Sequence, residues 1–350
     1  MLVSELDTPV LVIDLDVMEG NIKRIQDYCD THGLKFRPHV KTHKVPSIAH
    51  KQIAAGAVGI TCQKLGEAEV MAAAGIEDIL IPYNIVGEQK LERLMRLTRQ
   101  ATVTVAVDST YTAEGIARKA CEEGCTVNVI VELDTGGGRC GVQSPEEALA
   151  LAKEIVSMPS LLFKGVMTFP TRLESGPFIK KTLELLKDAG IPVSVVSGGG
   201  TGTEKFSHRI EGLTEIRLGT YVFYDYSHVR AGNCTLENCA LNVLVTVVSR
   251  PTPSRAIVDG GSKTFTNDHP IPDHGFHYVK EYPEARIYGQ SEEHGHMDVS
   301  LCPRKPAVGE RLTVIPNHAC GTVNLHDELI GVRNGKVEAV WPILARGKIR

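Results

Sequence analysis

Eight short apolar runs, each followed by a stretch of helical periodicity, fill the first two thirds of the chain. The runs have the aliphatic and β-branched composition of buried strands, and they are Leu34–Val40, Ala57–Cys62, Asp78–Pro82, Thr102–Val107, Thr126–Leu133, Leu162–Thr168, Pro192–Ser197 and Thr214–Leu218. Between them, stretches such as Leu65–Ala74 and Pro145–Glu154 repeat apolar residues at helical spacing. A doubly wound open sheet would alternate in the same way, but eight strand–helix units in one run favour closure. The sequence therefore predicts an α/β fold with a parallel (β/α)8 barrel, a TIM barrel.

The pattern changes after about residue 235, where short strands separated by Gly, Pro and Asn turns replace the alternation. These strands are Val243–Val248, Arg255–Asp259, Arg286–Gln290, Arg311–Ile315, Glu328–Arg333 and Lys336–Trp341. We expect residues 16–235 to form the barrel and residues 236–350 to form an all-β domain. The apolar strand Pro9–Asp14, within residues 1–15, has no place among the eight barrel strands and is expected to join the second domain.

Composition and charge restrict the class of protein. The chain has 350 residues, a net charge of −4 and an isoelectric point near 6.4, which argues against nucleic acid or an anionic membrane as a main partner. No apolar run reaches the roughly 18 residues that span a bilayer, and the first residues lack a basic region followed by an apolar one. Nine scattered cysteines, an odd number, are typical of free thiols in a cytosolic chain. We therefore expect a cytoplasmic protein.

The segment Arg37–Lys44, with sequence Arg-Pro-His-Val-Lys-Thr-His-Lys, places a lysine among other cations. Lys41 follows the first predicted strand, and active residues of barrels lie at the carboxyl ends of strands. Neighbouring positive charge favours loss of a proton from the ammonium group, and Schiff-base chemistry requires a neutral amine. A solvated basic loop would have the same composition, so the assignment depends on what else meets Lys41 at this edge.

Two glycine-containing loops at the same predicted edge suggest a phosphate site. The seventh strand leads into Ser-Gly-Gly-Gly-Thr-Gly-Thr at 197–203, whose backbone N–H groups can approach an anion closely. Flexible loops also contain glycine runs, but phosphate commonly binds after strands seven and eight of such barrels. An amine nucleophile beside a phosphate cradle fits pyridoxal 5'-phosphate (PLP). The candidate cradle residues are Gly199, Gly200, Thr201, Gly219 and Thr220.

Two further loops bring polar side chains to this edge. Arg139 lies in the glycine turn after strand five, either as a fixed donor to an anionic oxygen or as an ordinary surface arginine. Gln63 follows the second strand and either orients a substrate or caps the helix that begins near Leu65. We take Gln63 and His39 as candidate substrate contacts.

The second domain contains a pattern that suggests a metal site, Ile-Pro-Asn-His-Ala-Cys at 315–320. In an extended stretch, residues two apart share a face, so His318 and Cys320 can converge on one ion. An imidazole and a thiolate suit zinc, with manganese or magnesium as alternatives. Two protein ligands leave positions open to substrate or water, as a catalytic site requires. The acidic and histidine residues of Ser-Glu-Glu-His-Gly-His at 291–296 are further potential ligands.

Five motifs follow one another in an order that is specific at the level of a family. They are Arg37–Lys44, Glu132–Val142, Ser197–Thr203, Ser291–Gly295 and Pro316–Asp327. With them, nearly the whole chain resembles the D-threonine aldolase and D-serine dehydratase family, metal-dependent relatives of alanine racemase. The resemblance implies a fold-type III PLP enzyme with an N-terminal barrel, a C-terminal β domain and, usually, a homodimer with the site near the subunit interface.

The resemblance also implies roles for individual residues. Lys41 matches the Schiff-base lysine, and His318 with Cys320 matches the metal pair. Arg139 matches the arginine near the phenolic oxygen of the cofactor, and the two glycine loops match the phosphate loops. Aldolases of the family more often have a carboxylate at the position of Cys320, so this cysteine favours a dehydratase.

Two reactions of D-3-hydroxy amino acids remain open. In β-elimination, Lys41 would take the Cα proton while the metal helps the β-hydroxyl to leave, giving a keto acid and ammonia. Retro-aldol cleavage would instead give glycine and an aldehyde. Strand six ends in Met-Thr-Phe-Pro-Thr-Arg at 167–172, where aldolase relatives tend to have a tyrosine followed by Gly-His. We predict dehydratase-type elimination, with aldolase-type cleavage as the alternative.

Two other classes of protein use the same barrel. A non-catalytic PLP-binding protein would need neither the β domain nor the metal pair. An amino-acid racemase needs a second base on the opposite face of the cofactor, which a tyrosine or lysine of the β domain could supply. The expected partners are a small D-amino acid and a second copy of the chain.

Overall fold

The computed structural model describes residues 1–272 and 274–350, which divide into two compact units. Unit 1 contains Met1–Lys23, Thr42–Val45 and Thr220–Gly347. Unit 2 contains Arg24–Lys41, Pro46–Gly219 and Lys348–Arg350. The long helix α1 (Leu15–His32) begins in unit 1 and ends in unit 2.

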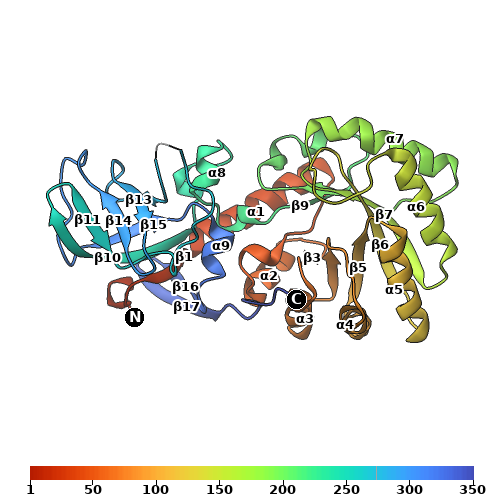
Figure 1. Cartoon of the computed structure of the whole chain (residues 1–350), viewed down its shortest axis with the longest axis horizontal. Helices are drawn as coiled ribbons and strands as arrows, with labels where there is room; N and C mark the ends of the chain where they lie inside the picture. Colours follow the sequence, from red (N-terminus) through yellow and green to blue (C-terminus); the bar gives the residue numbers. More distant parts are fainter. Residues whose placement is uncertain (273) are drawn as a thin grey trace. The chain divides into compact units, whose positions relative to one another are not determined.

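An eight-stranded parallel sheet forms the frame of unit 2 (Figure 1). Its order is β2-β9-β8-β7-β6-β5-β4-β3, and a parallel bridge between His39 and Thr61 links the segment after β2 to the last residue of β3. The strands are β2 (Lys35–Phe36), β3 (Ile60–Thr61), β4 (Asp78–Ile81), β5 (Thr102–Val107), β6 (Val127–Leu133), β7 (Leu161–Thr168), β8 (Val195–Gly199) and β9 (Glu215–Arg217). The predicted TIM-type barrel is confirmed.

Helices follow these strands and lie along the outer side of the sheet, as α4 to α7 show in Figure 1. They are α2 (Pro46–Ala54), α3 (Leu65–Ala73), α4 (Glu88–Thr98), α5 (Thr110–Glu122), α6 (Pro145–Ser157) and α7 (Gly176–Asp188). The start of α6 is set locally, because the Ser144 hydroxyl accepts the N–H of Glu147 and Pro145 occupies the first turn. Inside the unit, strands β4 to β7 contribute one apolar cluster, Leu80, Ala106, Ile130 and Met167. Since the strands are parallel, all their carboxyl ends reach one edge.

Unit 1 is built on a sheet in the order β13-β14-β11-β10-β1-β16-β17, with β15 pairing to β10 and β12 to β15 (Figure 1). Its strands are β1 (Val10–Asp14), β10 (Leu241–Thr252), β11 (Arg255–Val258), β12 (Tyr278–Val279), β13 (Arg286–Gln290), β14 (Gly295–Asp298), β15 (Arg311–Ile315), β16 (Glu328–Arg333) and β17 (Lys336–Pro342). The pairing is antiparallel except between β1 and β16. Short helices α8 (Tyr226–Arg230) and α9 (Ala319–Val323) complete the unit, and strands β12 and β14 were not predicted.

A membrane-spanning helix is not found in the described part of the chain, where no helix is both long enough and apolar enough to cross a bilayer.

Candidate active site

Lys41 lies at the carboxyl edge of the unit 2 sheet, in the single turn of 3-10 helix that spans Val40–Thr42. Its Nζ is 5.9 Å from the centroid of the Phe169 ring, and the guanidinium carbon of Arg139 is 4.9 Å from the same centroid. These three side chains come from the segments after β2, β7 and β6. The structure thus brings an amine, a flat apolar ring and a planar cation together, as a site for an anionic aromatic ligand requires.

Arg37, the first residue of the Arg37–Lys44 segment, forms ion pairs within the sheet. Its Nε donates to Glu215 at 2.9 Å and its Nη1 donates to Asp78 at 2.6 Å. Burial alone lowers the pKa of Arg37, but the two carboxylates raise it above its ordinary value. Arg37 therefore supports the sheet rather than acting on Lys41 as a bare charge, which differs from the crowding that the sequence suggested.

His39 and Gln63 form a hydrogen-bonded pair at the same edge. His39 is 9% exposed, and burial and the charge of Lys41 lower its pKa well below the ordinary value. The Lys41 backbone N–H points to Nδ1 at 3.4 Å, so Nε2 carries the proton and donates to Gln63 Oε1 at 3.0 Å. The backbone N–H of Gln63 donates to Glu67 at 2.7 Å. His39 is thus a neutral donor that fixes the amide of Gln63, and it is not placed as a base.

A buried carboxylate fixes Arg139. The Nη2 of Arg139 lies 3.3 Å from Oε1 of Glu132, whose side chain is 2% exposed. Burial raises the pKa of Glu132 more than Arg139 and Arg217 lower it. Glu132 therefore positions the guanidinium at the edge, and the sequence analysis assigned it no role.

Arg217, at the end of β9, is a second charged residue that the sequence analysis missed. Its guanidinium donates to the Ser197 hydroxyl at 2.5 Å and to the Thr168 carbonyl at 2.9 Å, and burial lowers its pKa to about 10. Ser197 in turn donates to Glu215 at 2.7 Å. The sequence pointed to Arg217 only in that a charged residue stands near the end of the apolar run Thr214–Leu218.

The glycine loop after β8 is tightly built. Gly199 has φ of +129°, and a Cβ there would lie 2.2 Å from the Arg217 carbonyl oxygen, so only glycine fits. The N–H of Gly199 donates to the Thr171 hydroxyl at 2.6 Å and that of Gly200 to the Arg217 carbonyl at 2.8 Å. A bound anion would therefore be held by the part of the loop beyond Gly200.

Beyond Gly200, the loop contains one buried hydroxyl suited to a phosphate oxygen. The N–H of Gly202 already donates to a carboxylate oxygen of Glu204 at 2.7 Å. The hydroxyl of Thr203 is buried and has no hydrogen-bond partner within residues 1–272 and 274–350. A buried hydroxyl requires a polar partner, and a phosphate oxygen supplies one. Thr201, Gly219 and Thr220 remain candidate residues for the same role.

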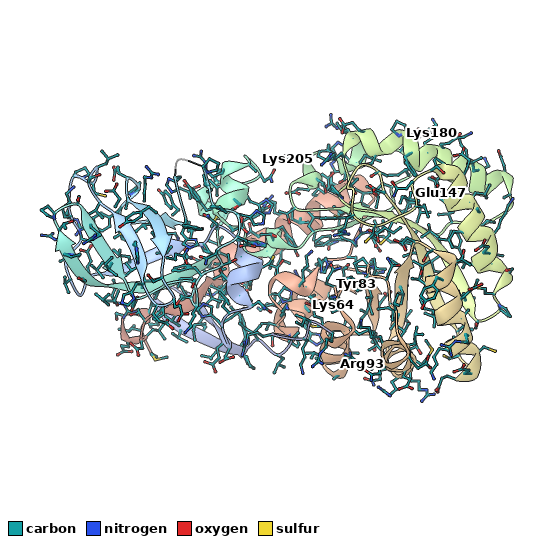
Figure 2. The ribbon with its side chains drawn as sticks, viewed as in Figure 1. Lys64, Tyr83, Arg93, Glu147, Lys180 and Lys205 are labelled. Carbon is teal, nitrogen blue, oxygen red and sulfur yellow. The ribbon has the colours of Figure 1, made fainter. Side chains whose placement is uncertain are left out.

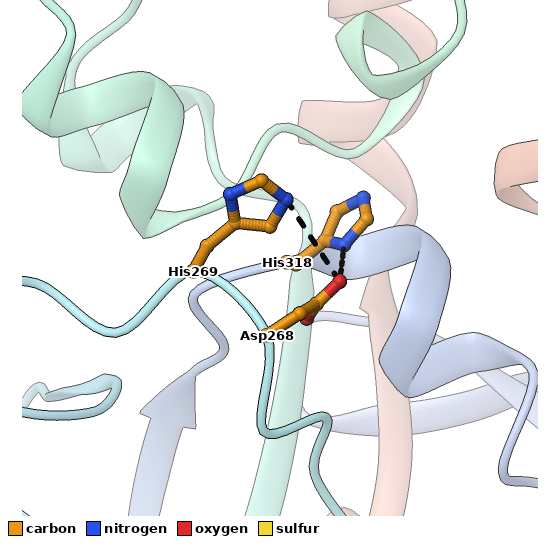
Figure 3. A group of neighbouring side chains, drawn as sticks. All are labelled: Asp268, His269 and His318. Carbon is orange, nitrogen blue, oxygen red and sulfur yellow. Dashed lines mark hydrogen bonds and ion pairs between the residues drawn. The ribbon is translucent and has the colours of Figure 1, made fainter.

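Unit 1 contains a cluster with the composition of a metal site (Figure 3). The ligand atoms of Asp268, His269 and His318 lie within 4.8 Å of one another. Oδ2 of Asp268 is 2.5 Å from Nδ1 of His318 and 3.8 Å from Nε2 of His269. Two imidazoles and a carboxylate suit a divalent cation such as zinc or manganese, so the residues present fit the expected metal.

Cys320 adjoins this cluster, although its backbone is not the extended one that was predicted. His318 has extended dihedrals (φ −136°, ψ 108°) and caps α9, whereas Cys320 lies in the first turn of that helix. The thiol is 3.2 Å from the Thr42 hydroxyl and 3.7 Å from the Thr220 hydroxyl. Burial lowers the pKa of His318, but hydrogen bonds and charges of Cys320 and Asp268 outweigh it and raise the pKa to about 9. The thiol and the imidazole are therefore brought together, as the sequence indicated.

Two buried polar residues form hydrogen bonds that fix the backbone around His318. Asp225, at 1% exposure, accepts the N–H of Ala319 at 2.9 Å and thereby fixes the start of α9. Asn317, fully buried, donates from its side chain to the His269 carbonyl at 2.8 Å. Asn317 thus ties the segment that carries His269 to the segment that carries His318.

Three of the four potential ligands in the 291–296 motif have other partners. Glu292 and Glu293 lie 3.2 and 3.3 Å from the ammonium of Lys263. His296 hydrogen bonds to the Ser291 hydroxyl at 2.9 Å. Within the described residues, none of them belongs to the cluster of Figure 3.

Replacement of Asp268 by asparagine is expected to weaken binding of Zn²⁺ by about 10- to 100-fold, because the variant lacks the anionic oxygen that faces both imidazoles. Calorimetric titration of the metal-free protein with Zn²⁺ measures this change. The matched control is Asp188→Asn at the exposed end of α7, which should bind Zn²⁺ as the unchanged protein does. Equal affinity of the Asp268 variant and the control would remove Asp268 from the metal site.

Comparison with known families gives two matches that follow the two parts of the chain. The model for the alanine racemase N-terminal domain matches residues 13–227. A second model, for a serine dehydratase domain, matches residues 240–332. Among curated proteins, a D-threonine aldolase from Arthrobacter sp is 37% identical over 98% of this chain and 94% of its own length.

Solved structures agree with these matches. The D-threonine aldolase from Filomicrobium marinum superposes with a TM-score of 0.93 at 34% identity, covering 100% of this chain and 99% of its own. The D-threo-3-hydroxyaspartate dehydratase from Delftia sp. HT23 has a TM-score of 0.89 at 33% identity, covering 97% and 98%. Variants of D-threo-3-hydroxyaspartate dehydratase replace a histidine and, two positions later, a cysteine by alanine, and the cysteine variant is described as the metal-free form.

Proposed function

The chain belongs to the family that joins an alanine racemase-type N-terminal domain to a serine dehydratase domain, and from this premise we propose that it eliminates water from a D-3-hydroxy amino acid. The relatives are lyases of D-hydroxy amino acids, which makes this chain a lyase of the same class. The finer assignment, elimination to a keto acid and ammonia, is our proposal.

The observation that carries the proposal is the pair His318 and Cys320. Their spacing equals that of the histidine and cysteine replaced in the two dehydratase variants, one of which is metal-free. A thiol hydrogen-bonded by Thr42 and adjacent to His318 is suited to bind a divalent metal as a thiolate. We propose His318 and Cys320 as protein ligands, with Asp268 and His269 as additional donors to the ion or its water.

The residues of unit 2 would hold PLP. Lys41 would supply the amine for the cofactor aldehyde and Phe169 an apolar surface for its ring. Arg139 would supply a donor to its phenolic oxygen, and the glycine loop beyond Gly200 would hold its phosphate. When bound, PLP withdraws electrons from the substrate Cα, which acidifies its proton. Lys41 would take that proton as the base. His318 and Cys320 would hold the metal, which would supply the Lewis-acid chemistry for departure of the β-hydroxyl, and the proton taken by Lys41 would complete the water that is lost. Gln63, fixed by His39, orients the substrate.

Retro-aldol cleavage to glycine and an aldehyde is the second candidate, and it is favoured by the identity to D-threonine aldolase over 98% of the chain. In this reaction Lys41 would still bind the cofactor, but the proton removed would be that of the β-hydroxyl. The two reactions thus differ in which proton the protein must take.

Product analysis decides between them. Protein loaded with PLP and Mn²⁺ or Zn²⁺ is incubated with D-serine, D-threonine and D-3-hydroxyaspartate, and the products are separated. We expect a keto acid and ammonia, and chelation should abolish their formation. Glycine with an aldehyde would establish the aldolase instead, inversion alone would indicate a racemase, and activity that survives chelation would contradict the metal assignment.

We further propose that the protein acts in the cytoplasm on a free amino acid and functions as a homodimer. Light scattering of the purified protein should give twice the chain mass of 38.0 kDa, and a monomer mass would contradict the dimer.

A further inference from the structure

A cavity of about 460 Å³ opens at the carboxyl edge of unit 2, over the ends of β3, β4 and β6. Its lining includes Gln63, Glu132 and Arg139, which belong to the site described above. It also includes Tyr83 and Lys90, which the proposed chemistry does not use. The cavity therefore extends the reaction site toward the start of α4.

The charged residues that line the cavity are Lys90, Glu132 and Arg139, so positive charge exceeds negative charge. Glu132 is the carboxylate of the lining, and it is paired with Arg139 at 3.3 Å. Lys90 has no ion-pair partner among the described residues, since the neighbouring acidic residues of α4, Glu88 and Glu92, face Arg118 and Lys119 on α5. An uncompensated ammonium beside a half-enclosed cavity favours an anionic ligand.

Tyr83, another lining residue, is in contact with a second ammonium group, that of Lys64. The ammonium of Lys64 lies 3.7 Å from the centroid of the Tyr83 ring, and Figure 2 shows the two residues next to each other. The adjacent ammonium of Lys64, and after it the charge of Lys90, lowers the pKa of the Tyr83 hydroxyl. The phenol is therefore polarised as a strong hydrogen-bond donor toward an anion.

We propose that Tyr83 and Lys90 form an anion subsite that binds the side-chain carboxylate of an acidic D-3-hydroxy amino acid. This inference rests on the proposed function, because it names the substrate class of the same site. Arg139 is already committed to Glu132 and to the ring of Phe169, so the charge left for a second substrate carboxylate is that of Lys90. A four-carbon diacid has such a second carboxylate, whereas serine and threonine do not.

The test compares acidic and neutral substrates in the loaded enzyme. For wild-type protein, kcat/KM should be higher for D-3-hydroxyaspartate than for D-threonine, whichever products form. Lys90→Gln should lower the ratio of the two values by about tenfold, mainly through KM of the acidic substrate, and Lys90→Glu should lower it further. The matched control Lys153→Gln, on the exposed face of α6, should leave the ratio unchanged.

A binding measurement separates failure of the subsite from failure of the proposed function. Succinate, titrated calorimetrically into the PLP- and metal-loaded protein, should bind the wild type and the Lys153 variant and bind Lys90→Gln at least tenfold more weakly. Succinate binding that is lost only in the Lys90 variants supports the subsite even if no substrate is turned over. A substrate ratio and a succinate affinity that are both insensitive to Lys90 would overturn it, even if turnover is observed.

Discussion

Replacement of Lys41 by alanine is expected to reduce turnover of D-3-hydroxy amino acids by on the order of 10³-fold or more. The amine at the edge of the barrel has two functions in the proposed reaction, attachment of the cofactor and transfer of the Cα proton, and alanine supports neither. The visible-edge absorbance of the PLP-loaded protein should disappear together with the activity. Absorption spectra and steady-state rates of the variant measure the two functions separately.

The control for this prediction is Lys35→Ala, which removes an exposed lysine from β2, the strand that precedes Lys41. Both variants lose one positive charge from the same segment, so an effect of general charge would appear in both. Only the Lys41 variant should lose absorbance. If it keeps both the spectrum and the rate, another residue must bind the cofactor and the site has to be sought elsewhere.

The barrel could be predicted because parallel strands are buried on both faces and therefore appear as continuous apolar runs. All eight predicted runs overlap strands β2 to β9, and the helical stretches at 65–74 and 145–154 overlap α3 and α6. Strand ends were less predictable. The first run was expected to extend to Val40, but β2 ends at Phe36 and the chain then continues toward Lys41 with single hydrogen bonds to the segment of β9.

The residues that position the site's side chains could not be predicted, because their roles depend on contacts between segments far apart in the sequence. Asp268 and His318 are 50 positions apart and share no motif, yet their side chains meet. Glu132 was visible within a motif, but its role follows from burial beneath Arg139 rather than from spacing. The placement of Cys320 in a helical turn likewise depends on Asp225, which fixes the first turn of α9 from 94 positions away.

His277 is a further residue without a sequence signal, and it holds Asn317 next to the metal site. The ring is 1% exposed and stacks on Phe265 with centroids 4.3 Å apart. The ring Nδ1 accepts the backbone N–H of Asn317 at 3.1 Å, and the backbone N–H of His277 donates to the Asn317 side-chain oxygen at 2.7 Å. A ring that accepts at Nδ1 carries its proton on Nε2, and the amide nitrogen of Gln290 lies 2.6 Å from that atom. Half a turn of the amide group exchanges its nitrogen and oxygen and turns this contact into a hydrogen bond. The oxygen of that amide, otherwise buried without a partner among the described residues, is the group that can accept this proton.

Acidification is therefore expected to destabilise the protein through His277. Burial lowers the pKa of its imidazole to about 3, although the charge of Asp268 raises it. Between pH 6.5 and 3 the unfolded chain binds a proton that the folded protein excludes, so the free energy of unfolding falls as the pH falls through this range. At about 1.4 kcal/mol for each pH unit, the full contribution of this one residue is on the order of 5 kcal/mol.

Urea unfolding at pH 7.5 and pH 5 isolates this contribution. His277→Gln should lower stability at pH 7.5, because it removes the stacked ring, but it should lose less stability on acidification than the wild type, because the titrating group is gone. The variant should also bind Zn²⁺ more weakly, since the imidazole no longer accepts the backbone N–H of Asn317, the residue before His318. His294→Gln, an exposed histidine of the same unit, should retain both the acid sensitivity and the Zn²⁺ affinity of the wild type. An unchanged pH dependence in the His277 variant would show that the buried imidazole does not limit stability in acid.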